Sequence, residues 1–174
     1  GHGIQLVSGE GLLVNQGAIR ADASVGNAGS ILLDSSQATV LTPGSLTSAS
    51  SQQGNGGEIR VFSGDYARQQ GAVQANSSAA GNGGFVEVSA PHVAMSRPVD
   101  VSAAQGTSGV FLLDPDNVFI RVGGTDPANQ SAATPGDIEV DPSALNVTGS
   151  VFLEASQSIV FDNGVQVNLD GATN

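Results

Sequence analysis

A short turn signal recurs along the chain at nearly constant spacing, and this repeat limits the folds that the chain can adopt. Gly-Asn-Ala-Gly at residues 26–29 returns as Gly-Asn-Gly-Gly at 54–57 and 81–84, with a looser copy, Gly-Thr-Ser-Gly, at 106–109. The three steps are therefore 28, 27 and 25 residues. A fixed period of this length is typical of solenoid proteins, in which each repeat forms one turn of a coil.

The segment that follows each turn signal alternates between apolar and other residues. This period of two predicts a β-strand with one buried face. Equivalent inward positions should stack into one ladder in the core, formed by Ile31, Ile59, Val86, Phe111 and Val151. At the corners, the asparagines should stack as a second ladder, formed by Asn27, Asn55 and Asn82.

Each repeat also contains two further short apolar segments, so we predict three strands per turn. One of them is represented by Leu46–Ser48, in which the first and third residues should face inward. Parallel stacking of such turns predicts an all-β fold, a right-handed parallel β-helix of about six turns. Glycine is too frequent for stable helices, at 24 of 174 residues.

The repeat is interrupted once. From Gly109 to Gly149 the step is 40 residues, and the excess is a loop-like segment at 123–137, which we interpret as an insertion at one corner. Behind Asp141, residues 142–145 (Pro-Ser-Ala-Leu) predict one short helical turn. We therefore expect residues 1–174 to form a single β-helix segment with one insertion, and to belong to a longer chain.

Charge and composition exclude several functions. The chain has no lysine, only five arginines and 16 acidic residues, and its net charge is −11. Such a surface repels phosphate backbones, so nucleic acid is not an expected partner. The absence of cysteine excludes disulfides and cysteine-based zinc sites. We expect no cofactor.

Candidate sites are few. Asp114, Asp116 and Asn117 could bind calcium through hard oxygen ligands, although a tight Asp-Pro turn is the favoured interpretation. His92 has no second histidine nearby, so a hydrogen-bonded histidine is favoured over a metal ligand. The insertion offers four polar residues for contact with a partner: Asp126, Asn129, Gln130 and Asp137.

Aromatic residues are scarce, with no tryptophan and one tyrosine. Because sugars usually stack on aromatic rings, a strong lectin site is not expected. Phe85, beside a glycine corner, and Phe62, Phe119 and Phe161 are expected to pack in the coil or against the insertion.

Several segments resemble the filamentous haemagglutinin family of secreted exoproteins. These are residues 83–90 (GGFVEVSA), 99–104 (VDVSAA) and 109–118 (GVFLLDPDNV). The last is close to the family pattern G-x-W-L-x-D-P-x-N, with Phe111 at the tryptophan position. The resemblance covers roughly residues 54–162, and the Asn-Pro-Asn motifs of the family's secretion domain are missing from this sequence.

The resemblance implies a non-catalytic structural shaft of a bacterial surface adhesin that supports cell attachment or biofilm cohesion. It implies secretion to the cell surface through an outer-membrane partner transporter. A host receptor, a glycan or a matrix polysaccharide would be the partner of the whole protein, and self-association is expected through the uncapped ends of the coil.

Two other functions are open. The chain could be a binding module that recognises a protein or a glycan through residues 123–137. It could also be a polysaccharide-degrading β-helix enzyme, but hydrolases of this shape need acidic residues on neighbouring turns. Asp34 and Asp114 share one position of the repeat but should lie three turns apart, roughly 14 Å at the usual strand spacing. An enzyme is therefore not expected.

Overall fold

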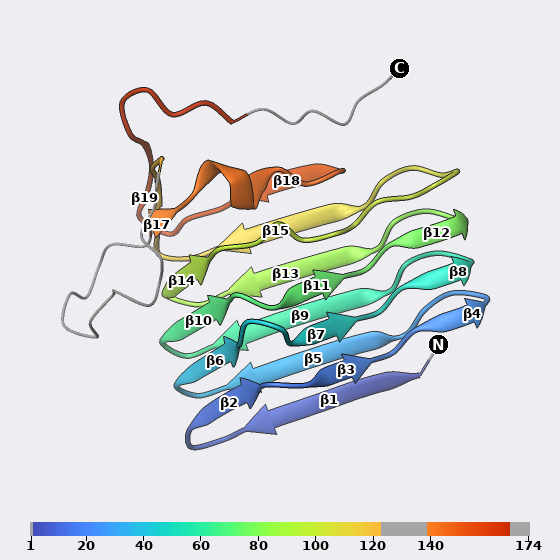
Figure 1. The fold of residues 1–174 in the computed structure, drawn as a ribbon. Helices are drawn as coiled ribbons and strands as arrows, with labels where there is room; N and C mark the ends of the chain where they lie inside the picture. The colour runs from blue at the N-terminus through green and yellow to red at the C-terminus, as the bar shows by residue number, and fades with distance from the viewer. Residues whose placement is uncertain (1, 123–138, 168–174) are drawn as a thin grey trace.

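The computed structural model describes residues 2–122 and 139–167, and within them the chain winds into a parallel β-solenoid (Figure 1). The first three turns each contain four short strands. They are β1 (Gly3–Ser8), β2 (Leu12–Asn15), β3 (Ala18–Arg20) and β4 (Ala23–Val25); β5 (Ser30–Ser35), β6 (Ala38–Leu41), β7 (Leu46–Ser48) and β8 (Ser51–Gln53); and β9 (Glu58–Ser63), β10 (Tyr66–Gln69), β11 (Ala72–Gln74) and β12 (Ser77–Ala80).

The fourth turn is less regular. It contains β13 (Phe85–Ser89) and β14 (His92–Met95), after which Asp100 and Ala103 make isolated bridges to Gln74 and Ser77. The chain continues through β15 (Val110–Asp114), β16 (Asn117–Ile120), β17 (Glu139–Val140), the 3₁₀ helix η1 (Pro142–Leu145), β18 (Ser150–Leu153) and β19 (Ser158–Phe161). No helix among the described residues is long and apolar enough to cross a membrane.

Equivalent strands stack in parallel, as the repeat predicts. The longest sheet has the order β1-β5-β9-β13-β15-β18. The expected core ladder is present in register: Ile31 pairs with Ile59, Val86 with Ile59 and Phe111, and Phe111 with Val151. The buried members of this ladder are Ile31, Ile59, Val86 and Phe111, and Val151 is partly buried and packs against the core.

The count of turns and strands differs from the prediction. We expected about six turns of three strands, whereas the solenoid has about four regular turns with three to four strands each. The fourth strand of each turn escaped prediction, and in two of the three turns it has no apolar alternation: β8 is Ser-Gln-Gln and β12 is Ser-Ser-Ala-Ala, whereas β4 is Ala-Ser-Val. In β8 and β12 the first serine bonds to the previous turn: Ser51 Oγ donates to Gly26 O at 2.6 Å and Ser77 Oγ to Gly54 O at 2.9 Å.

The orientation of β7 was also predicted incorrectly. Thr47, not Leu46, occupies the inward ladder, where it pairs with Ile19 and Val73 and is fully buried. A polar side chain is tolerated there because Asn15 Nδ2 donates to Thr47 Oγ1 at 3.2 Å.

The interruption of the repeat falls between β16 and β17. Arg121 N donates to Val140 O at 3.1 Å, so the chain returns to the place where it left the coil. Since β17 pairs with β16 and also contacts β14, it lies between the fourth and fifth turns. The predicted helical turn at residues 142–145 is confirmed, and Asp141 caps it by accepting from Ser143 N at 2.8 Å.

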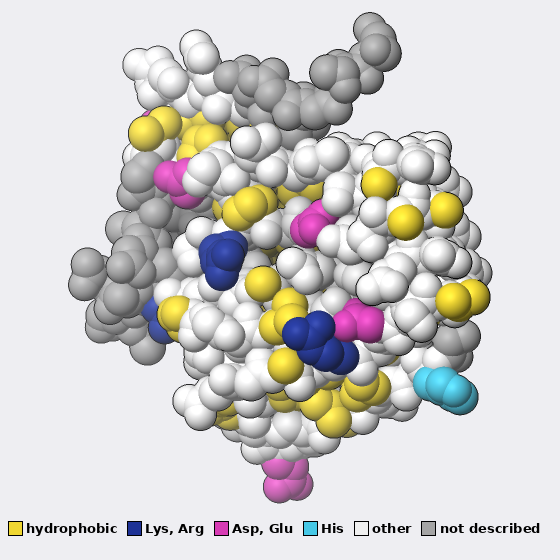
Figure 2. Space-filling view, turned by 45° about the vertical axis from the view of Figure 1, so that its right-hand side comes forward, with side chains coloured by type: hydrophobic (Ala, Val, Ile, Leu, Met, Phe, Trp, Pro, Cys, Tyr) yellow, Lys and Arg dark blue, Asp and Glu magenta, His cyan; other side chains and the backbone are white. Residues whose placement is uncertain are grey.

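Few charged side chains lie on the outside of the coil. The face in Figure 2 consists mostly of neutral polar side chains and backbone, with hydrophobic side chains and a few carboxylates and arginines scattered over it; one arginine and one carboxylate lie next to each other. This agrees with the low content of charged residues, 12% of the chain. At the N-terminal end, Leu6 is 41% exposed although its ladder partner Leu33 is fully buried, because a turn covers Leu6 on one side only.

Candidate functional site

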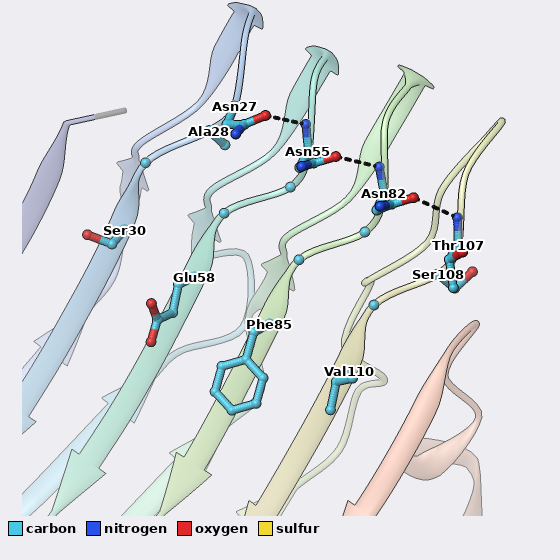
Figure 3. Close-up of a pocket in the computed structure, with 16 residues that line it drawn as sticks. Asn27, Ala28, Ser30, Asn55, Glu58, Asn82, Phe85, Thr107, Ser108 and Val110 are labelled. Atoms are coloured by element: carbon cyan, nitrogen blue, oxygen red, sulfur yellow. Dashed lines mark hydrogen bonds between the residues drawn. The ribbon is translucent and has the colours of Figure 1, made fainter.

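A groove of about 730 Å³ runs along the solenoid at the corner where the chain passes into the long sheet (Figure 3). Its lining repeats once per turn. Each turn supplies an outer rim residue, two small floor residues, and an inner rim residue at the start of the long-sheet strand. We call it the corner groove; it is lined by residues 27–30, 55–58, 82–85 and 107–110.

The outer rim is the predicted asparagine ladder. Asn27 Oδ1 accepts from Asn55 N at 3.0 Å, Asn55 Oδ1 from Asn82 N at 2.9 Å, and Asn82 Oδ1 from Thr107 N at 3.0 Å (Figure 3). A backbone N–H can only donate, so the amide oxygen must face it and the Nδ2 group must point elsewhere. No described residue accepts a hydrogen bond from these three Nδ2 groups, which remain exposed donors.

Removal of one asparagine side chain from the ladder should lower the free energy of unfolding by a small but measurable amount. In an Asn55→Ala variant, the N–H of Asn82 loses its side-chain acceptor and bonds to water instead. The expected loss is about 1 kcal/mol, the usual net value of one hydrogen bond, measured by urea denaturation. Asn55→Asp keeps an acceptor oxygen and should recover most of the loss. Equal stability of the alanine variant and the parent chain would contradict a stabilising role for the ladder.

In the two central turns the floor of the groove is bare backbone formed by glycines, whereas Ala28 and Ser108 add small side chains in the outer turns. A Cβ atom on Gly57 would lie 1.9 Å from the carbonyl oxygen of Gly29, and one on Gly84 would lie 2.0 Å from that of Gly57. Only glycine allows two turns to approach so closely at this corner. The same position is glycine in all four copies of the turn signal, and the floor of the two central turns carries no side chain.

The inner rim is one ladder of the long sheet, formed by Ser30, Glu58, Phe85 and Val110. Phe85 is partly exposed, and the guanidinium carbon of Arg60 lies 5.5 Å from its ring centroid. Arg60 also pairs with Glu58, and with Glu87 at 3.3 Å. Burial raises the pKa of Glu87 above the ordinary value of a glutamate, against the opposing effect of Arg60.

The expectation that the phenylalanines pack in the coil was wrong. Phe62 and Phe119 each alternate with buried neighbours on their strands and are only partly buried, so they face outward. Phe85 lies on the inner rim rather than in the coil, and Phe161 is 54% exposed. The buried phenylalanine of the long sheet is Phe111. Phe85 directly precedes the inward residue Val86, so the alternation of the strand places its side chain outside. This signal was present in the sequence.

The calcium candidates do not form a cluster of ligands. Asp116 Oδ1 accepts from Ser156 Oγ at 2.7 Å, and Asn117 Oδ1 accepts from Ser158 Oγ at 2.6 Å. Asp114 Oδ2 is 3.4 Å from Ser89 Oγ. Within residues 2–122 and 139–167, no group of three or more histidines and carboxylates is placed to hold a metal ion. These side chains instead join neighbouring turns.

The remaining candidate residues are His92 and the polar residues of the insertion. His92 Nδ1 lies 3.1 Å from Asp65 Oδ1, so it is hydrogen-bonded to the preceding turn, as expected. The four polar residues of the insertion lie outside the described residues; they are Asp126, Asn129, Gln130 and Asp137.

Comparison with known proteins adds no relative. The chain matches no protein-family model, no curated protein and no solved structure at a significant level.

Proposed function

We propose that this chain is a non-catalytic shaft segment of a bacterial surface adhesin of the filamentous haemagglutinin type. The observation that carries the proposal is the continuous core of the solenoid, which extends through successive turns as unbroken ladders of apolar side chains. Such a coil is stabilised by contacts between neighbouring turns, so it can be extended by adding turns. It suits a rod that holds other regions of a protein away from the cell.

The segment with the most specific resemblance fits this role. Residues 109–118 form β15 and the start of β16, and Phe111 at the motif's aromatic position is fully buried in the core ladder. The motif therefore serves packing between turns in this chain. The parent protein would be exported through an outer-membrane partner transporter and remain at the cell surface.

An enzymatic role has less support. Asp34 and Asp114 belong to one ladder, but Phe62 and Ser89 stand between them. The two carboxylates are thus three strand spacings apart, roughly 14 Å, which exceeds the range of about 5–9.5 Å used by glycoside hydrolases.

A binding role for the insertion at 123–137 can be tested separately from the shaft. Deletion of residues 124–136 should leave the solenoid folded, because Arg121 and Val140 already hold the two ends of the insertion together by a hydrogen bond. We expect the midpoint of thermal unfolding, followed by circular dichroism, to change by only a few degrees. Loss of folding would mean that the segment covers the core.

Attachment of cells then separates the two functions. If the chain is only a shaft, this deletion should not change the attachment of bacteria that display the parent protein. Attachment should also be unchanged when the whole segment is replaced by an unrelated solenoid of equal length. Surface levels are compared by labelling intact cells. If the loop deletion alone abolishes attachment while surface levels are maintained, the insertion is the binding element. If only the replacement abolishes it, the coil has a function beyond spacing.

A further inference from the structure

We infer that the corner groove binds a straight, neutral, β-1,4-linked oligosaccharide that lies along the axis of the solenoid. This goes beyond a shaft role, because a spacer needs no ligand. The groove is formed by residues of the coil itself, so the inference does not depend on the insertion at 123–137. Four features of the groove identify the ligand: its floor, its row of donors, its inner rim and its charge.

The floor determines what shape can enter. Gly57 and Gly84 present only backbone, and a Cβ at either position would collide with the previous turn. Because residues 56, 57, 83 and 84 are all glycine, a flat ring can lie close to the floor over the two central turns. The groove volume of about 730 Å³ is within the range of about 300–1,000 Å³ of small-ligand sites, and the groove is long and straight (Figure 3).

The outer rim determines the hydrogen bonds. Asn27, Asn55 and Asn82 hold their amide oxygens in the ladder, and the Nδ2 group of each has no acceptor among residues 2–122 and 139–167. These donors recur at the strand spacing, about 4.8 Å. In an extended β-1,4-linked chain, one sugar residue advances by slightly more than this, and its ring and hydroxyl oxygens can accept from such a row.

A peptide fits this row poorly. An extended peptide advances about 3.3 Å per residue and alternates donors with acceptors along each edge. The asparagine rim offers donors only, at a longer interval. A peptide lying in the groove would leave its own N–H groups without acceptors along this rim, whereas a sugar hydroxyl can act as donor or acceptor as needed.

The inner rim supplies the second contact. Phe85 offers part of an aromatic ring, on which the C–H face of a sugar can pack. Beside it, Glu58 provides a carboxylate that can accept from sugar hydroxyls while it pairs with Arg60. One ring and a few amides make a shallow, weak site rather than a tight lectin pocket, in keeping with the scarcity of aromatics in the chain.

Charge determines that the ligand is neutral. The chain carries −11 overall, and Glu58 lies on the rim itself. An anionic polysaccharide would be repelled by this field, particularly at low salt.

The test is an NMR titration of the ¹⁵N-labelled 174-residue chain with four tetrasaccharides: cellotetraose, chitotetraose, the α-1,4-linked maltotetraose and the anionic tetragalacturonate. We expect saturable shifts for one or both β-1,4-linked probes at the side-chain amides of Asn55 and Asn82 and the backbone amide of Gly84. Maltotetraose and tetragalacturonate should bind at least fivefold more weakly. Absence of shifts in the groove, or equal binding of the anionic probe, would overturn the inference.

Two variants localise the site. Phe85→Ala should weaken binding at least fivefold, whereas Phe152→Ala should not change it, because Phe152 lies on the same outer sheet face but outside the groove and is 55% exposed. Circular dichroism spectra confirm that both variants fold. Equal weakening by the two substitutions would show general adsorption to the sheet face and would also overturn the inference.

Discussion

A Gly84→Ala variant is expected to lose about 3 kcal/mol or more of its free energy of unfolding, or to fail to fold. The added Cβ would lie 2.0 Å from Gly57 O and 2.8 Å from Gly56 C. Neither contact can be relieved by rotating a side chain, since both partners are backbone atoms. Separating the two turns would break the bond from Phe85 N to Gly57 O, which is 2.9 Å long.

The matched control is Gly9→Ala. Gly9 lies in the turn between β1 and β2, and a Cβ there would meet no atom within 4 Å. Its substitution should change stability by no more than about 0.5 kcal/mol. Urea denaturation of the two variants compares them directly. Similar losses would show that glycine acts at residue 84 through backbone flexibility and not through the close approach of the turns.

A Val88→Asp variant should be destabilised by more than about 3 kcal/mol at neutral pH. Val88 is fully buried in the ladder between Val61 and Leu113, and the surrounding core is apolar. The chain has no lysine that could reach the new carboxylate. Ala79→Asp, on an exposed position of β12, introduces the same charge and should have little effect.

The pH dependence provides a second readout for the Val88→Asp variant. Burial raises the pKa of a carboxyl group above its unfolded value, because the charged form loses its hydration. Such a group costs least where it is protonated in both states, below its unfolded pKa of about 4, and its cost grows as the pH rises from there. The stability deficit should therefore shrink toward pH 4. A deficit of the same size at every pH would indicate a steric effect, and a small deficit at neutral pH would show that residue 88 faces solvent.

The sequence alone was sufficient for the architecture of the long sheet. The glycine corners recur at a fixed interval, and the strand after each corner alternates with a period of two. These two patterns together align Ile31, Ile59, Val86 and Phe111 in one ladder. The asparagine ladder followed from the same offset. Both features are local patterns repeated at a constant distance along the chain, and such patterns can be read directly from the sequence.

Tertiary structure decided the remaining features. The strands Ser51–Gln53 and Ser77–Ala80 have no apolar alternation, and a serine hydroxyl in each bonds to the preceding turn. Thr47 takes an inward position because Asn15, 32 residues away, reaches its hydroxyl. The corner groove likewise exists only after the turns have stacked. Each turn contributes one residue to each rim, and the groove is formed by four turns together. Contacts between residues a full turn apart determine these features, and no local pattern in the chain encodes which polar groups will meet.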